Sequence, residues 1–266
     1  MRHLLVSLSL AALATAQQRD PAKGVNFYSI EKEIALGRHL AGEVARDKKP
    51  LDSPVVLSYI EGIGQQLAAR MAGQSYTYTF ALIDDKTPYS EVIALPGGFV
   101  FVPTFVILAA KDEDELAGIL AHSIAHVASR DSTKSATRAE LVNTAAQPLL
   151  FMGGWTGYAM RQGAGLAIPM GFLDMYRKQE LAADRRAVDV MAAAGYDPAA
   201  FARYVQRELA QFEGAGTKPA FSPLPPVEQR LEAIGLAIGN LPMQSYAAHP
   251  GLAQIQDEVR RLTGRP

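Results

Sequence analysis

Two histidines four positions apart are the residues whose types and spacing most directly suggest chemistry in this chain. His122 and His126 lie in an apolar stretch, Leu120 to Val127, that carries no formal charge. In a helix this spacing puts both imidazole rings on one face, one turn apart, as in a metal-binding pair. The alternative is a pair of buried histidines that hydrogen-bond to backbone or carboxylate groups. The spacing favours the metal.

A catalytic zinc typically takes three protein ligands and leaves one position open, so the pair needs a third partner. The chain has no cysteine. The carboxylates Glu180 and Asp184, again four apart, are the best candidates. Glu180 would bind the metal, and Asp184 would accept the second ring N–H of a ligand histidine. The alternative, which the spacing alone leaves equally open, is a solvated acidic face among the basic residues Arg177, Lys178, Arg185 and Arg186.

Local patterns predict a mostly helical α+β fold with a small β-sheet around these residues. The acidic run 112–115 suits a helix N-terminus, so both histidines should lie on a helix that begins there. Strand-forming residues predict two strands, at 76–83 and 99–102. Apolar residues at helical spacing predict further helices at 29–45, 53–71, 173–194, 199–212, 227–238 and 252–262.

The stretch from Leu141 to Met160 carries no formal charge, which raises the question of a membrane helix. Its Asn143, Gln147 and Pro148, together with several glycines, argue against a stable span. We therefore expect a lid or a packed hairpin over the site. The alternative is a segment that touches a membrane surface.

Composition and the N-terminal residues limit the possible location of the protein and the classes of partner it can have. The chain has 266 residues, a formal net charge of −1 and 48% hydrophobic residues, which suggests neither a nucleic-acid partner nor disorder. Residues 1–16 have the pattern of a cleavable signal peptide, with Arg2 and His3 before an apolar run; the alternative is a buried N-terminal helix. We expect one domain at 17–266, with its core at about 30–240, in the periplasm or secreted. No cysteine follows the cleavage site to carry a lipid anchor.

Several stretches of the chain together carry a family resemblance. Glu180 and Asp184 match a Glu-x-x-x-Asp pattern, and the histidine pair matches His-Glu-x-x-His in all but one position. With the stretches 94–100, 114–122 and 194–198, these motifs resemble the HtpX-like and CAAX-prenyl-protease-like zinc metallopeptidases, including their soluble periplasmic BepA-like branch. The likeness covers about residues 30–238 and implies a zincin-type metallopeptidase domain. It also implies Zn²⁺ as the cofactor, bound by His122, His126 and Glu180.

The resemblance further implies a mechanism and a path for the substrate. In the family, a water attacks a peptide carbonyl, and the glutamate between the two histidines takes the water's proton. The residues Gly97, Gly98, Phe99 and Val100 would offer a strand edge on which an extended polypeptide lies.

The chain departs from the family pattern at three positions near this chemistry. Ser123 stands in place of the general-base glutamate, Glu91 in place of an asparagine and Leu224 in place of a histidine, whereas the family's arginine remains as Arg230. A serine hydroxyl is not a base near neutral pH, and loss of general acid–base help costs about 10²–10⁴-fold in rate. Glu91 is a candidate substitute base if its carboxylate lies within reach of the water.

Three functional hypotheses follow, the first two from different classes. The favoured one is a zinc-binding pseudoprotease that holds extended or misfolded envelope polypeptides, with hydrolysis impaired because Ser123 replaces the base. The alternative is an active metalloendopeptidase that uses Glu91, or the metal-activated water alone. A second alternative is a metal-free structural relic.

Overall fold

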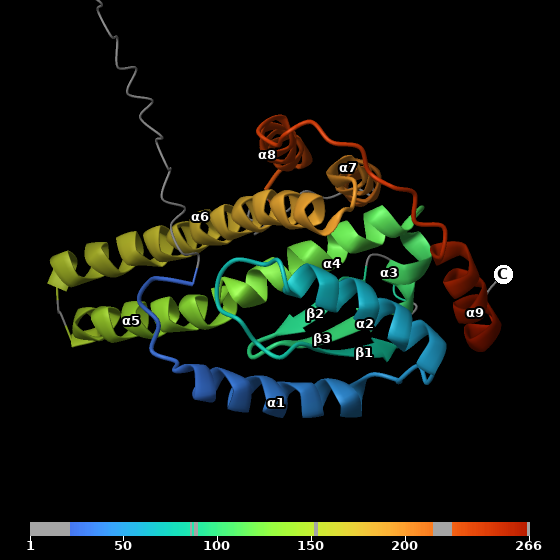
Figure 1. Ribbon diagram of the computed structural model, residues 1–266. Helices are drawn as coiled ribbons and strands as arrows, with labels where there is room; N and C mark the ends of the chain where they lie inside the picture. Colours follow the sequence, from blue (N-terminus) through green and yellow to red (C-terminus); the bar gives the residue numbers. More distant parts are fainter. Residues whose placement is uncertain (1–21, 86, 88–89, 152–153, 215–224, 265–266) are drawn as a thin grey trace, which may run out of the picture.

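The computed structural model describes residues 22–85, 87, 90–151, 154–214 and 225–264 (Figure 1). Within these ranges the fold is mostly helical with a small three-stranded sheet, as the sequence predicts. The signal-peptide prediction for residues 1–16 and the departure at Leu224 lie outside the described residues. The elements are α1 (Ile30–Asp47), α2 (Pro54–Ala68), β1 (Thr79–Ile83), β2 (Ile93–Leu95), β3 (Phe99–Pro103), α3 (Thr104–Ala109), α4 (Glu113–Ala128), α5 (Asp131–Phe151), α6 (Gly154–Ala194), α7 (Pro198–Gly214), α8 (Val227–Gly239) and α9 (Leu252–Thr263).

Local capping signals explain where the key helices begin and end. The Ser53 side chain accepts a hydrogen bond from the Val56 N–H, and Pro54 occupies the first position of α2. At the start of α4, the Asp112 side chain accepts from the Glu115 N–H in the same way. The helix that carries the two histidines therefore begins where the acidic run predicts.

The sheet has the strand order β1-β3-β2, with β1 parallel and β2 antiparallel to β3. Since β3 is the central strand, its backbone groups pair on both sides. The prediction that Phe99 and Val100 offer a free strand edge is therefore wrong. Gly97 and Gly98 form the turn that leads into β3, and a Cβ at Gly97 would meet the Cα of Ile34 at 2.7 Å. The edge strand on the α4 side is β2, which the sequence did not predict.

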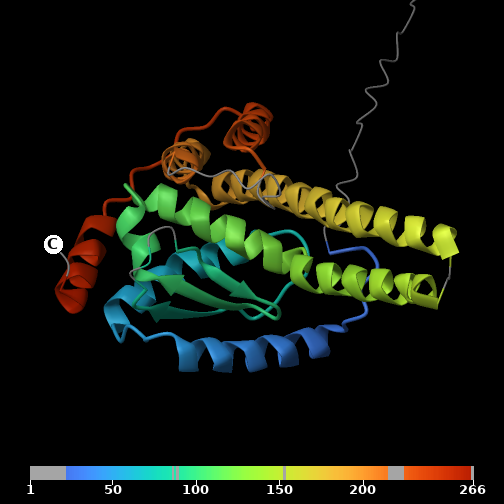
Figure 2. The ribbon, with the colours of Figure 1, turned by 180° about the vertical axis from the view of Figure 1, so that it is seen from behind.

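The elements lie in layers around this sheet. Helix α1 runs along one face, and α2 and α4 lie against the other (Figure 1). Helices α6 and α7 form a further layer on α4, α8 packs against α6 and α7, and α9 packs beside α2 and α3 (Figures 1 and 2). Helix α4 is consequently enclosed by the sheet, α2, α6 and α7.

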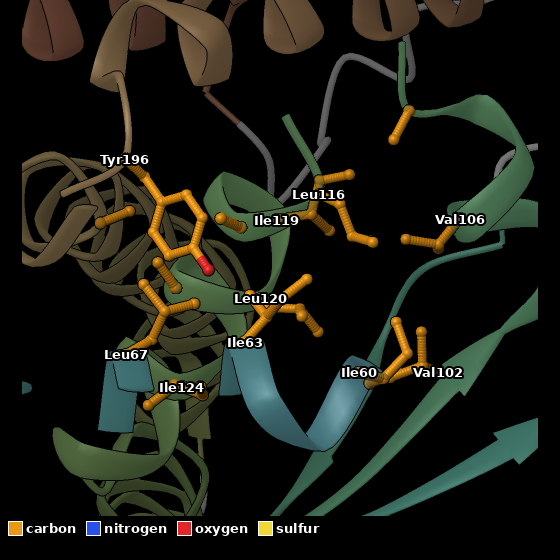
Figure 3. Packing of buried hydrophobic residues seen from close by; sticks show 14 of the residues in the cluster. Ile60, Ile63, Leu67, Val102, Val106, Leu116, Ile119, Leu120, Ile124 and Tyr196 are labelled. Atoms are coloured by element: carbon orange, nitrogen blue, oxygen red, sulfur yellow. The ribbon is translucent and has the colours of Figure 1, made fainter. Parts of the chain in front are cut away.

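The hydrophobic core lies around α4, with contributions from α2, the sheet, α6 and α7. Ile60, Ile63 and Leu67 from α2 meet Leu120 and Ile124 from α4, and all are fully or almost fully buried (Figure 3). Most residues of α4 are buried, so packing on several sides fixes the orientation of this helix and of the face that carries the histidines. This rigid helix is the platform for the histidine pair.

Helices α5 and α6 form a long antiparallel hairpin that extends away from the sheet (Figures 1 and 2). The described residues of the stretch 141–160, 141–151 and 154–160, which was predicted as a lid or packed hairpin over the site, lie at the far end of this hairpin. Helix α6 begins at Gly154, far before the predicted start at residue 173, and α5 was not predicted as a helix. Among the described residues, no helix is both long and apolar enough to cross a membrane.

Candidate metal centre

Helices α4 and α6 bring three potential metal ligands together. Nε2 of His122 lies 3.2 Å from Nε2 of His126. The two carboxylate oxygens of Glu180 lie 3.3 Å from these nitrogens, one from each. All three side chains are partly exposed, at 17–22% of their surface. The structure thus brings His122, His126 and Glu180 into one accessible cluster.

The donor set fits a tetrahedral zinc ion. Zinc bonds of about 2.0–2.1 Å at the tetrahedral angle separate neighbouring donor atoms by roughly 3.4 Å. The separations of 3.2 and 3.3 Å in this cluster agree with that value. Two imidazole nitrogens this close repel each other when both present lone pairs, and the Glu180 carboxylate adds negative charge. A cation between the three groups would remove this repulsion.

A carboxylate lies behind each histidine on the side away from the cluster. Nδ1 of His126 lies 2.8 Å from Oδ2 of Asp131, in hydrogen-bond geometry. Nδ1 of His122 lies 2.9 Å from Oδ1 of Asp184, although the alignment falls short of a hydrogen bond. A proton on Nδ1 leaves Nε2 as the electron-pair donor, which is the tautomer that a metal ligand requires.

Arg230 of α8 holds Asp184 in place. Its Nε and Nη2 donate to the two carboxylate oxygens of Asp184 at 2.7 and 2.5 Å. Asp184 is fully buried and Arg230 is 6% exposed, so both ends of the pair are removed from water. Arg230 therefore acts on His122 through Asp184.

The pKa shifts of the cluster reflect its excess of negative charge. Burial opposes protonation of His126, but hydrogen bonds with Asp131 and Glu180 outweigh it and raise the His126 pKa to about 9. Burial likewise opposes ionisation of Glu180, but the two histidines hold its pKa well below the usual range. For Asp184, burial is again overcome, here by Arg230 and His122, and the pKa is lowered. Surroundings that stabilise a proton on His126 also favour a divalent cation in its place.

Ser123 lies beside the two ligands but offers no base. Its hydroxyl donates to the carbonyl oxygen of Ile119, one turn back on α4, at 3.0 Å, and the residue is 7% exposed. The hydroxyl is thus engaged in the helix that carries it. No carboxylate occupies the position between the two histidines.

A cavity of about 680 Å³ opens onto the cluster. One part of its lining is apolar, with Phe105 and Val106 from α3, Ile119 from α4, and Phe201 and Val205 from α7. The Phe201 ring lies 5.9 Å from the His122 ring, between centroids. Another part is lined by small and polar residues of α5 and α6, among them Ser132, Ser135 and Gln179.

Glu91, the candidate substitute base, lines the same cavity as His122, Ser123 and Arg230. Burial acts to lower the Arg230 pKa, but Asp184 above all, with smaller contributions from the charges of Glu180 and Glu91, raises it. Val92, just before β2, and Ala94, within β2, also line the cavity. The cavity is not lined by Gly97, Gly98, Phe99 or Val100.

Asp131 is a functional residue that the sequence did not predict. It lies five positions after His126, and the only local signal was an acidic residue at the start of a helix, which is common without any role at a site.

Comparison with known proteins identifies the family. The model of peptidase family M48 matches residues 57–238, more than half of the chain. A "Protease HtpX homolog" of Pseudarthrobacter chlorophenolicus is 30% identical and covers 98% of this chain and 93% of its own length. The "Beta-barrel assembly-enhancing protease" of Escherichia coli is 24% identical over 76% of this chain and 43% of its own length. The "Mitochondrial metalloendopeptidase OMA1" of Schizosaccharomyces pombe is 32% identical over 53% of this chain and 40% of its own length.

These matches confirm the resemblance to the HtpX-like and BepA-like metallopeptidases. The chain spans about half the length of the beta-barrel assembly-enhancing proteases that it matches. The match also accounts for the group of two histidines and a glutamate, because M48 enzymes are metal-dependent peptidases, typically with zinc. The chain belongs to peptidase family M48.

Proposed function

We propose that this protein binds Zn²⁺ at His122, His126 and Glu180 and holds extended polypeptide at that site, with hydrolysis impaired. The observation that carries this proposal is the contrast between the ligands and the base. The donor atoms lie at zinc-compatible separations of 3.2–3.3 Å, while the hydroxyl of Ser123 is bonded to the Ile119 carbonyl.

Zinc bound in this position would supply Lewis acidity towards a peptide carbonyl. The protein's own residues would do the rest. Asp131 and Asp184 would orient the two imidazole rings, and Arg230 would keep Asp184 ionised and fixed. A proton that leaves an attacking water would find no carboxylate at position 123. Loss of this general base would lower the rate by about 10²–10⁴-fold.

The polypeptide would lie along β2 rather than β3. Since β2 is an edge strand, an added strand can hydrogen-bond to its backbone. Val92 and Ala94 border the cavity, whose apolar lining includes Phe105, Phe201 and Val205. We therefore expect a preference for extended segments that carry a large apolar side chain, as unfolded proteins expose.

An active metalloendopeptidase is the second candidate, and the position of Glu91 favours it. Glu91 lines the cavity together with His122 and Ser123, so a carboxylate is available near the cluster. A general base must lie within hydrogen-bond reach of the proton that it takes, about 2.6–3.2 Å or one water further. A substrate that draws Glu91 to that distance would restore the chemistry.

The test combines metal analysis with a client assay on purified protein. We expect about one zinc per chain, a much lower zinc content in His122→Ala, and saturable binding of fluorescent unfolded casein without chelator-sensitive cleavage. If native wild-type protein contains no zinc, the remaining hypothesis is a metal-free structural relic of a peptidase. Chelator-sensitive cleavage by the wild type would instead establish the active peptidase.

The proposed location is the periplasm or the cell exterior, on the basis of the signal-peptide pattern at residues 1–16. The end of the α5–α6 hairpin, residues 141–160, is proposed to contact a membrane surface. Cell fractionation and flotation with lipid vesicles test these two points. Recovery of unprocessed protein in the cytoplasm, or no vesicle binding above that of a variant with the hairpin shortened, would refute them.

A further inference from the structure

The junction between α4 and α5 has an unusual backbone. Arg130 takes a φ of +60°, and it is the one residue other than glycine with positive φ in the described part of the chain. It follows the end of α4, where Ser129 and Arg130 donate backbone hydrogen bonds to the Ala125 and Val127 carbonyls. This position is most often glycine, because a Cβ is disfavoured in the left-handed region.

The Arg130 side chain is held by the N-terminal part of the fold. Its Nε donates to Oε1 of Glu33 at 3.0 Å, and its Nη2 donates to the Tyr28 carbonyl oxygen at 2.5 Å. Glu33 lies on α1, 97 positions away, and is 1% exposed. Its carboxylate also accepts from the hydroxyls of Tyr76 and Thr133.

The same junction determines where Asp131 lies. The Arg130 carbonyl accepts from the Lys134 N–H at 3.0 Å, which starts α5 at this turn. Asp131 is the next residue, and its carboxylate reaches Nδ1 of His126 at 2.8 Å. A different backbone conformation at Arg130 would turn Asp131 away from the histidine, since the φ angle of one residue directs all that follows.

We infer that Glu33 and Arg130 form a clamp that positions Asp131 against His126 and so increases the metal affinity of the site. The inference rests on the proposed zinc binding. It makes the N-terminal segment, through Tyr28 and Glu33, part of the support of the metal centre. Glu33 and Arg130 are positioning residues, because neither touches the ligand cluster directly.

A glycine at position 130 would be enough if this residue only had to form the turn between α4 and α5. Glycine at position 130 would adopt the left-handed turn without steric cost, yet this chain places a long cation there and buries a carboxylate to receive it. The clamp also explains why Thr133, two positions after Asp131, bonds to the same carboxylate. Both flanks of Asp131 are thereby fixed to Glu33.

The test measures the zinc dissociation constant by competition with a chromogenic chelator. Outer partners of metal ligands change affinity by 10–100-fold when removed, and we expect Glu33→Gln and Arg130→Gly each to weaken zinc binding about 10-fold. Glu31→Gln, an exposed glutamate on the same helix, is the matched control and should bind as the wild type does. In an Asp131→Ala background, the effect of Glu33→Gln on the zinc dissociation constant should fall below about 2-fold, because Glu33 influences the metal only through Asp131.

The possible results distinguish failure of the clamp from failure of the zinc binding on which it rests. Zinc dissociation constants within about 2-fold of wild type in folded Glu33→Gln and Arg130→Gly would overturn the clamp, however far the melting temperature falls. If Glu33→Gln does not fold, Arg130→Gly decides, because glycine permits the left-handed turn but removes the side chain that ties this turn to Glu33. Wild-type protein that binds no zinc would overturn the proposed function and the clamp together.

Discussion

Restoring the missing base is the sharpest perturbation that the structure suggests. Ser123→Glu places a carboxylate between His122 and His126, where the hydroxyl now bonds to the Ile119 carbonyl. The cavity of about 680 Å³ in front of the residue leaves room for the longer side chain. The substitution therefore adds a base without displacing the packed core behind α4.

The expected gain follows from the value of general acid–base catalysis. A positioned base contributes about 10²–10⁴-fold, which corresponds to roughly 3–5 kcal/mol of transition-state stabilisation. We expect chelator-sensitive cleavage of casein to rise by at least about 100-fold over wild type. The added charge joins Glu180, Asp184 and Asp131, so the metal-free variant should be less stable than metal-free wild type.

The assay is release of fluorescent fragments from labelled casein, with zinc content measured on the same samples. Ser123→Gln is the matched control, since it has the same length as glutamate but cannot take a proton. A Ser123→Glu protein that folds, binds one zinc and still does not cleave would refute the reasoning. In that case the loss of the base is not what limits this protein.

Three further predictions use other parts of the site. Chelation should lower the free energy of unfolding by about 2.7 kcal/mol relative to protein with free zinc at 100 times its dissociation constant, seen as a melting temperature roughly 5–10 °C lower; an unchanged melting temperature would contradict a folded-state metal site. Arg230→Met should cost about 3–5 kcal/mol in a urea titration, because it leaves the Asp184 carboxylate buried without its cation, and a loss under about 1 kcal/mol would contradict this account. Glu91→Gln should leave casein binding and any residual cleavage unchanged, and a more than 10-fold loss of cleavage would favour Glu91 as the substitute base.

The helix that carries the metal ligands was predictable because its signals are local. The acidic run before α4, the apolar residues along it and the i,i+4 spacing of His122 and His126 are properties of neighbouring residues. The same spacing marked Glu180 and Asp184 as partners on a second helix. The backbone geometry of one helix turn is enough to say which of these side chains share a face.

The assembly of the site was decided by the tertiary structure. Spacing could not show that Glu180 of α6 meets the Nε2 atoms of α4 at 3.3 Å, because that distance depends on how two helices cross. The central position of β3, which removed the predicted edge at Phe99, depends on a strand as short as β2. Contacts between residues far apart in sequence carry no periodic signature.

The side chains that hold the two histidines in place also divide into those that the sequence indicated and those that only the fold revealed. Sequence placed Arg230 near the site only through the family pattern, whereas the fold pairs it with Asp184. Asp131 and Glu33 had no distinguishing pattern in the sequence, and only the fold brings Asp131 to His126 and Glu33 to Arg130. By itself, the sequence determined which residues could bind a metal and that the base is missing at Ser123. Only the packing of α1, α4, α5, α6 and α8 decided which groups hold those ligands in position, because burial and long-range contacts fix a side chain more strongly than local propensity does.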